Sequence, residues 1–244
     1  MFYRKYLLPV QFDLTHVAIL KQGLHNVIPD VTLITLKSLS NHLLINLIVM
    51  KKSFFSGVTA LVLTLAFSSP LSGAELDKSL IHAHWFFAAH RQQGQKLMPI
   101  QGGPRPVFKG RVQFLMDPIP PRVELSGGGE RLILSDGPAD ANLPQGPFAI
   151  ETWVRMDGPS ERGGIIGAIQ HDPDIEAGWI LGYREDRFCF GLASEAQAKL
   201  TYLESQASFV PGKWYHVVGN YSGSSMELWV DGARVAQSHI QQGK

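Results

Sequence analysis

Apolar and polar residues alternate with a period of two along much of the second half of the chain. Phe148, Ile150, Thr152 and Val154 fall on one face of an extended segment, and residues 187–192 alternate in the same way. This alternation predicts β-strands that bury one face. With the short apolar runs bounded by Gly, Pro, Asp and Ser, it predicts strands at residues 131–134, 148–154, 164–170, 178–183, 187–192, 200–203, 214–221 and 226–230.

The pattern before residue 123 is less regular. Residues 80–87 predict an earlier strand, and a helix over residues 77–93 is the alternative. Residues 101–121 are rich in Gly and Pro, which predicts mainly loop with one strand near residues 112–115. With no strong helical period elsewhere in the region after residue 75, the sequence predicts an all-β domain.

Residues 50–74 are typical of a secretory signal peptide. Met50 is followed by two lysines, an apolar run from Phe54 to Phe67 and small residues that end at Ala74. The apolar run is shorter than the about 20 residues that span a bilayer. We expect cleavage after Ala74.

A signal peptide works at the start of a chain, yet residues 1–49 precede this one. Those residues show no clean period, so we expect an over-extended start, with Met50 as the true initiator. The alternative is a membrane anchor over residues 43–67, which Lys51 and Lys52 would interrupt with two charges.

Charge and cysteine content narrow the choice of partners. The chain has 22 Lys and Arg against 21 Asp and Glu, which leaves no field to attract nucleic acid or an anionic membrane. Cys189 is the only cysteine, so it forms no intramolecular disulfide. Its place between Phe188 and Phe190 predicts a buried thiol.

Several short motifs occur in an order that resembles the laminin-G-like jelly roll of the concanavalin A-like lectin/glucanase superfamily, as found in secreted bacterial proteins. They are Phe148-x-Ile150-x-x-Trp153-Val154, Gly178-Trp179-x-Leu181-Gly182-Tyr183, Trp214-x-His216-Val217-Val218 and Val230-Asp231-Gly232. The resemblance implies a two-sheet antiparallel sandwich. It also implies further strands after Gly232, so we expect a jelly roll that is incomplete at the C-terminus.

The predicted organisation has four parts. Residues 1–49 are the over-extended N-terminus, residues 50–74 the signal peptide, residues 75–122 an N-terminal strand with a Gly/Pro-rich region, and residues 123–244 the partial laminin-G-like sandwich.

Catalytic motifs are missing from the sequence. Retaining glycosidases pair two carboxylates about 5 Å apart, but Glu151 and Glu227 each stand alone on their predicted strands. Neither a Gly-x-Ser-x-Gly motif nor the metal-binding motifs of phosphoesterases occur. We therefore expect no enzyme in this chain. The alternative is an accessory module of a secreted hydrolase of the calcineurin-like metallophosphoesterase type, whose catalytic domain lies outside the chain.

Relatives of this kind bind sugars or glycoproteins, which the resemblance implies here as well. Sugar binding needs an exposed aromatic platform beside polar groups, and the predicted ligand-binding residues are Trp179, Tyr183, Arg184 and Tyr202. By resemblance, three other tryptophans are assigned to packing: Trp153, Trp214 and Trp229.

Calcium is the cofactor that such relatives often hold in loops. Asp172, Asp174 and Glu176 supply three carboxylates within five residues, which suits an oxygen-liganded cation. A solvated turn is the alternative for this acidic loop. Asp136 and Asp140 form a second acidic loop.

The sequence thus predicts a secreted, periplasmic or extracellular module without catalytic activity. The expected partner is a carbohydrate or glycoprotein surface, with no nucleic acid and no stable membrane insertion after signal cleavage. A structural spacer that binds no ligand is a further alternative.

Overall fold

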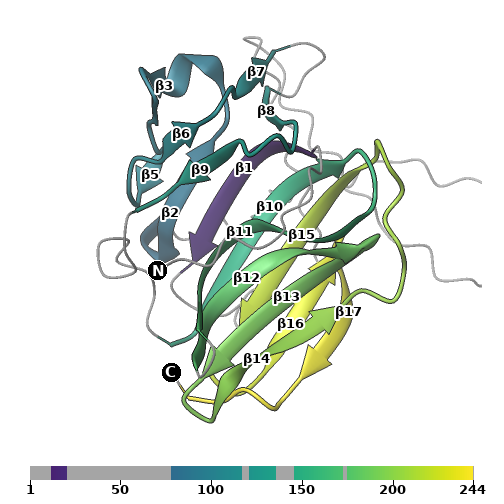
Figure 1. The fold of residues 1–244 in the computed structure, drawn as a ribbon. Coiled ribbons are helices and arrows are strands. Elements are labelled where there is room, and N and C mark those ends of the chain that lie inside the picture. The colour runs from purple at the N-terminus through teal and green to yellow at the C-terminus, as the bar shows by residue number, and fades with distance from the viewer. Residues whose placement is uncertain (1–11, 21–77, 117–120, 136–145, 173–174, 244) are drawn as a thin grey trace, which may run out of the picture. The chain divides into compact units, whose positions relative to one another are not determined.

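The computed structural model describes residues 12–20, 78–116, 121–135, 146–172 and 175–243 (Figure 1). These residues form three antiparallel sheets and two short 3-10 turns, Lys78–Leu80 and Ala89–Arg91. No helix among them is long and apolar enough to cross a membrane.

The largest sheet has nine strands. Seven follow the order β17-β16-β15-β10-β1-β2-β5, while β8 pairs with β1 and β7 pairs with β8. Their bounds are β1 (Phe12–Leu20), β2 (Ile81–Phe86), β5 (Gln101–Gly102), β7 (Gln113–Leu115), β8 (Arg122–Leu125), β10 (Phe148–Met156), β15 (Trp214–Tyr221), β16 (Met226–Val230) and β17 (Ala233–Ser238).

Two four-stranded sheets accompany it. One has the order β11-β12-β13-β14 and the other the order β3-β4-β6-β9. Their bounds are β11 (Ser160–Asp172), β12 (Ile175–Glu185), β13 (Arg187–Ser194), β14 (Gln197–Glu204), β3 (Gln92–Gln93), β4 (Lys96–Leu97), β6 (Val107–Lys109) and β9 (Arg131–Ile133).

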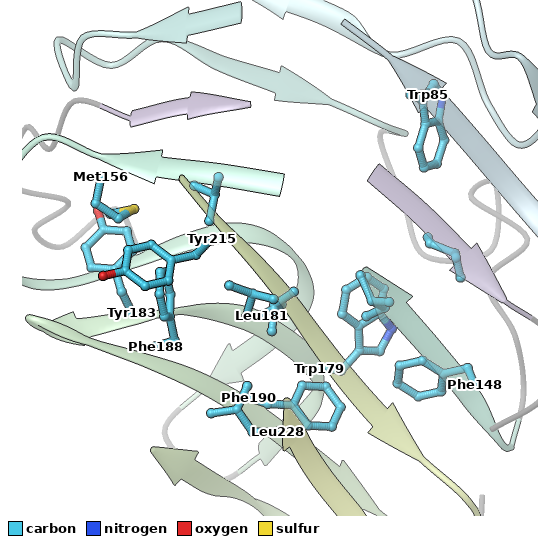
Figure 2. Packing of buried hydrophobic residues seen from close by; sticks show 14 of the residues in the cluster. Trp85, Phe148, Met156, Trp179, Leu181, Tyr183, Phe188, Phe190, Tyr215 and Leu228 are labelled. Carbon is cyan, nitrogen blue, oxygen red and sulfur yellow. The ribbon is translucent and has the colours of Figure 1, made fainter. Parts of the chain in front are cut away.

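The core lies between the nine-stranded sheet and the β11–β14 sheet. The Phe148 ring of β10 lies 5.6 Å from the Trp179 ring of β12 and 6.3 Å from the Phe190 ring of β13 (Figure 2). Inward side chains of both sheets belong to one apolar cluster. This face-to-face packing of antiparallel sheets confirms the predicted all-β sandwich.

The predicted strands of the second half are confirmed. β15 and β16 have the predicted bounds, and the four side chains expected on one face of β10 are at most 4% exposed. Asp231 and Gly232 both have positive φ, at 49° and 77°. That backbone matches the twist of the hairpin between β16 and β17.

Residues 81–86 form a strand, which confirms the strand predicted at residues 80–87; the alternative of a helix over residues 77–93 is wrong for its described part. Other elements differ from the sequence analysis. Residues 101–115 hold three short strands: β7 matches the strand predicted near residues 112–115, whereas β5 and β6 lie where loop was predicted. β17 directly follows Gly232, where the resemblance implied further strands. The sequence did not place it, because its side chains alternate weakly; pairing with β16 fixes its position.

Residues 12–20 form β1, a strand that no pattern in the sequence indicated. β1 lies between β10 and β2, pairing Ile19 with Ile150 on one side and Ala83 on the other, and Ile19 is 1% exposed. The predicted signal peptide, residues 50–74, lies outside the described residues. The initiator at Met50 and the four-part organisation therefore stay predictions.

Candidate functional site: a tryptophan face on the large sheet

Three tryptophans lie on the face of the nine-stranded sheet that points away from the core. Trp153 sits between Thr152 and Val154, which are fully buried, so the alternation of β10 turns its ring outward. Trp214 in β15 and Trp229 in β16 point the same way, and all three are partly exposed. We call this surface the tryptophan face; its members are Glu151, Trp153, Arg155, Trp214, His216, Asn220, Glu227, Trp229 and Arg234.

Each of the three rings has a cationic or imidazole neighbour from the adjacent strand, because the strand register places them opposite each other. The pairs are His216 stacked on Trp153 (centroids 5.3 Å apart, planes at 29°), Arg155 over Trp214 (5.9 Å) and Arg234 over Trp229 (5.9 Å). Contacts of this kind contribute about 0.5–1 kcal/mol at exposed sites. They favour the orientations that the indole rings adopt here.

Glu227 anchors one end of the tryptophan face. Its side chain is only 5% exposed, and its carboxylate accepts hydrogen bonds from Asn220 Nδ2 (3.0 Å), Trp229 Nε1 (3.2 Å) and Arg234 (2.9 Å). Burial alone would raise the pKa of Glu227, but these hydrogen bonds offset it and leave the pKa below the ordinary value. The site therefore carries a fixed, buried negative charge.

A second acid lies near the middle of the tryptophan face. The Glu151 carboxylate of β10 is 3.3 Å from His216 Nε2 of β15, and the two side chains are 31% and 27% exposed. His84 of β2 lies close enough for Glu151 to raise its pKa, yet burial dominates and the pKa of His84 is lowered. Polar atoms that can bond a ligand thus lie beside the Trp153 ring.

The residues predicted to bind ligand do not lie on one surface. Trp179 and Tyr183 are 6% and 3% exposed and pack between the sheets (Figure 2), so neither belongs to an exposed platform. Burial raises the pKa of Tyr183 to about 12. Tyr202 is 43% exposed, with Arg184 above its ring at 5.7 Å and bonded to Glu204 at 2.7 Å. Ligand binding at Tyr202 and Arg184 stays a prediction.

Sequence reasoning assigned Trp153, Trp214 and Trp229 to packing, whereas the structure turns all three outward. A period-two signal was present in the sequence. Each of these tryptophans has a polar or charged residue two positions away, as Trp153 has Glu151 and Arg155. Trp179, in contrast, alternates with apolar Leu181 and Tyr183.

The acidic loop predicted to bind calcium is only partly described. Asp174 lies outside the described residues, and Asp172 is described only as the last backbone position of β11. Glu176 accepts a hydrogen bond from the Leu200 N–H through Oε2, at 3.0 Å. The second acidic loop, with Asp136, is also outside the described residues. Calcium binding stays a prediction.

Cys189 lies in the core, as predicted, at 5% exposed. Desolvation raises the pKa of its thiol to about 12, and Glu204 adds to the effect. A thiol with so little thiolate at neutral pH is chemically inert.

Comparison with known proteins finds a match to a family model in the second half of the chain. The model of the Laminin_G_3 family, described as concanavalin A-like lectin/glucanases superfamily, matches residues 127–244. Pappalysin-1 of Mus musculus is 31% identical over 140 residues, and Pappalysin-1 of Homo sapiens is 30% identical over 140 residues. Each match covers 52% of this chain and 8% of the relative. Laminin G-like domains are generally non-catalytic binding modules and are typically extracellular.

Proposed function

We propose that the chain, whose residues 127–244 match the model of the concanavalin A-like lectin/glucanase superfamily, is a secreted binding module that holds a carbohydrate on the tryptophan face. The observation that carries the proposal is the set of three partly exposed indole rings, each beside a charged or imidazole side chain. A sugar ring has an apolar face and a rim of hydroxyls. Indole rings can stack on the apolar face of the sugar, and the flanking polar groups can form hydrogen bonds with its hydroxyls.

The positions of the rings favour an extended ligand. Trp153 and Trp214 are diagonal neighbours on adjacent strands, about 7–8 Å apart at the backbone. Trp229 lies one strand further, in β16. A chain of two or more sugar units would contact more than one ring, whereas a monosaccharide would contact one.

Charge favours a neutral sugar at this site. Residues 136–244 contain 8 Lys and Arg against 14 Asp and Glu, a net charge of 8 − 14 = −6. Within the tryptophan face itself, Glu151 and Glu227 are balanced by Arg155 and Arg234. The face therefore has no excess of cations to hold an anionic ligand, and the net negative charge of the surrounding residues disfavours one.

A glycan array probed with the purified full chain, followed by calorimetry on the best ligands, tests the proposal. Trp153→Ala should weaken binding roughly tenfold, because losing about 60 Å² of apolar contact removes about 1.5 kcal/mol. Tyr202→Ala is the matched control, since it removes an exposed aromatic ring from the other sheet. Retained binding in Trp153→Ala with loss in Tyr202→Ala would move the site to Tyr202 and Arg184. Absence of any glycan ligand would refute the proposal.

An accessory role inside a larger protein is the second candidate. The two relatives carry this kind of domain as 8% of their length, which supports use of the module as one part of a long chain. The calcineurin-like phosphoesterase context remains a hypothesis. Phosphatase assays on the natural full-length product with a metal supplement would test it, and lack of activity would contradict it.

Calcium remains part of the proposal through the acidic loop of Asp172, Asp174 and Glu176. Calcium that binds only the native state adds about 2.7 kcal/mol to the free energy of unfolding at a hundredfold excess over Kd. The unfolding temperature therefore rises. We expect a chelator to reverse the rise and Asp174→Asn to reduce it. An unfolding temperature that is indifferent to calcium would remove the metal site.

Secretion is tested by N-terminal sequencing of the exported protein. We expect the first residue to be Glu75, directly after the predicted cleavage site at Ala74. A mature protein that starts at Glu75 would lack β1, the strand between β10 and β2. A mature protein that starts before Met50 would keep β1 and would contradict the over-extended start.

A further inference from the structure

The charge of the chain is divided unevenly along the sequence. Residues 78–135 contain 8 Lys and Arg against 3 Asp and Glu, a net charge of 8 − 3 = +5. Residues 136–244 carry the net charge of −6 given above, and the whole chain only +1. The near-neutral total therefore conceals a basic region, and this region contains the sheet β3-β4-β6-β9.

Strand register gathers three cations on one face of that sheet. Lys109 of β6 lies directly opposite Arg131 of β9, and Lys96 of β4 lies opposite Val107, two residues before Lys109. All three charged side chains are exposed. The other face of the sheet carries Phe108, which is buried in the core. The cations therefore point to solvent together.

These cations have no carboxylate partner among the described residues. Neither Lys109 nor Arg131 forms an ion pair within 4 Å there, although Glu130 is adjacent in sequence. The Glu130 side chain lies against Gly128, with Oε2 buried. Arg131 donates one hydrogen bond to the Gly129 carbonyl at 3.1 Å, which orients its guanidinium and leaves other N–H groups for a ligand.

Like charges directly opposite on neighbouring strands are destabilising. Lys109 and Arg131 are such a pair, and Arg105 and Arg111 are exposed on either side of β6. A bound anion would offset this repulsion. Cations on three successive strands, about 5 Å apart from strand to strand, suit a polymer with repeated negative groups better than a single small ion.

We propose that this surface binds a sulfated polysaccharide. We call it the basic face; it comprises Lys96, Lys109 and Arg131, flanked by Arg105 and Arg111. The other outward positions of the sheet are Gln93, Val107 and Ile133, and none is aromatic. Single-stranded nucleic acids bind largely by stacking bases on aromatic side chains, so a sulfated sugar chain fits this surface better. The basic face is separate from the tryptophan face in its residues and in its sheet.

The test measures binding of the full chain to immobilised heparin at increasing NaCl concentration. Charge-driven binding should weaken steeply with salt. The triple variant Lys96→Gln, Lys109→Gln, Arg131→Gln should bind roughly 3- to 100-fold more weakly, because it removes three exposed ion contacts. Its salt dependence should be shallower, and its unfolding temperature should stay equal or rise as the Lys109–Arg131 repulsion is lost.

The matched control is Arg162→Gln, Arg187→Gln, Lys199→Gln, which removes the same charge from exposed positions on the β11–β14 sheet. It should keep heparin binding. Equal loss in both triple variants, or no heparin binding by the unmodified chain at low salt, would overturn the proposal. Tighter binding of a DNA duplex than of heparin would also overturn it, in favour of nucleic acid.

Trp153→Ala should leave heparin binding unchanged, so failure of the neutral-sugar site and failure of the basic face are distinguishable. The single variant Lys109→Glu repeats the test should the triple variant not fold.

Discussion

The buried carboxylate of Glu227 should be a strong local determinant of stability, and Glu227→Gln tests this. The carboxylate accepts three hydrogen bonds, from Asn220, Trp229 and Arg234, while only 5% of the side chain is exposed. Glutamine has nearly the same shape but offers one acceptor oxygen. Its amide NH₂ would face groups that are themselves donors.

The size of the effect follows from those contacts. Hydrogen bonds to a charged partner contribute about 1.5–3 kcal/mol each, and a buried donor left without an acceptor costs about 1–3 kcal/mol. The substituted glutamine would keep one acceptor, and Arg234 is 47% exposed and can turn to water. We therefore expect Glu227→Gln to lower the free energy of unfolding by about 2–4 kcal/mol.

The pH dependence gives a second, independent readout. Because the folded-state pKa of Glu227 lies below its ordinary value of 4.5, the unfolded chain binds the proton more tightly. The stabilisation from Glu227 is therefore complete above about pH 4.5 and is lost as the pH falls through the lower, folded-state pKa. Glu227→Gln should lack this part of the acid destabilisation.

Urea unfolding followed by circular dichroism at several pH values measures both effects. Glu151→Gln is the control, since it makes the same chemical change on the same face at a side chain that is 31% exposed. It should cost less than about 1 kcal/mol. The reasoning is refuted if the two variants cost the same, or if Glu227→Gln keeps the full acid dependence of the unmodified protein.

Three further predictions concern packing. Gly219→Ala would bring a Cβ within 2.5 Å of the buried Phe190 ring, so it should cost about 1–3 kcal/mol in urea unfolding. Gly158→Ala, which meets nothing within 4 Å, should cost less than about 0.5 kcal/mol; equal costs would contradict the close contact. Cys189, with a thiol pKa of about 12, should react with iodoacetamide at pH 8 only after unfolding, and rapid labelling of the native chain would show that the thiol is accessible. Gln241→Ala removes four hydrogen bonds between a fully buried amide and β13 and β14, so it should cost about 2–4 kcal/mol; a neutral effect would show that the segment after β17 is not held there.

Local alternation was enough to find several strands and their buried faces. In β10 and β13 the inward positions were predicted from period two alone, because a half-buried strand must place apolar side chains on every second residue. The Asp231–Gly232 hairpin was predictable for a similar local reason, since both turn residues adopt positive φ.

The candidate site was harder to predict. The family resemblance assigned Trp153, Trp214 and Trp229 to packing, although their polar neighbours two positions away indicated outward-facing rings. The residues two positions away distinguish Trp153 from Trp179 in the sequence. The sequence does not show that Trp153, Trp214 and Trp229 lie on one surface. That meeting depends on the register of β10 with β15 and of β15 with β16.

The all-β class, the inward faces of the main strands and the burial of Cys189 follow from the sequence alone, since they depend on residues close together along the chain. The place of β1 between β10 and β2, and of Lys109 opposite Arg131, emerges only in three dimensions. Such pairings join segments far apart in sequence, and the backbone hydrogen bonds that make them are the same for every residue type except proline. The side-chain pattern therefore fixes which face of a strand is buried, but not which strand lies beside it.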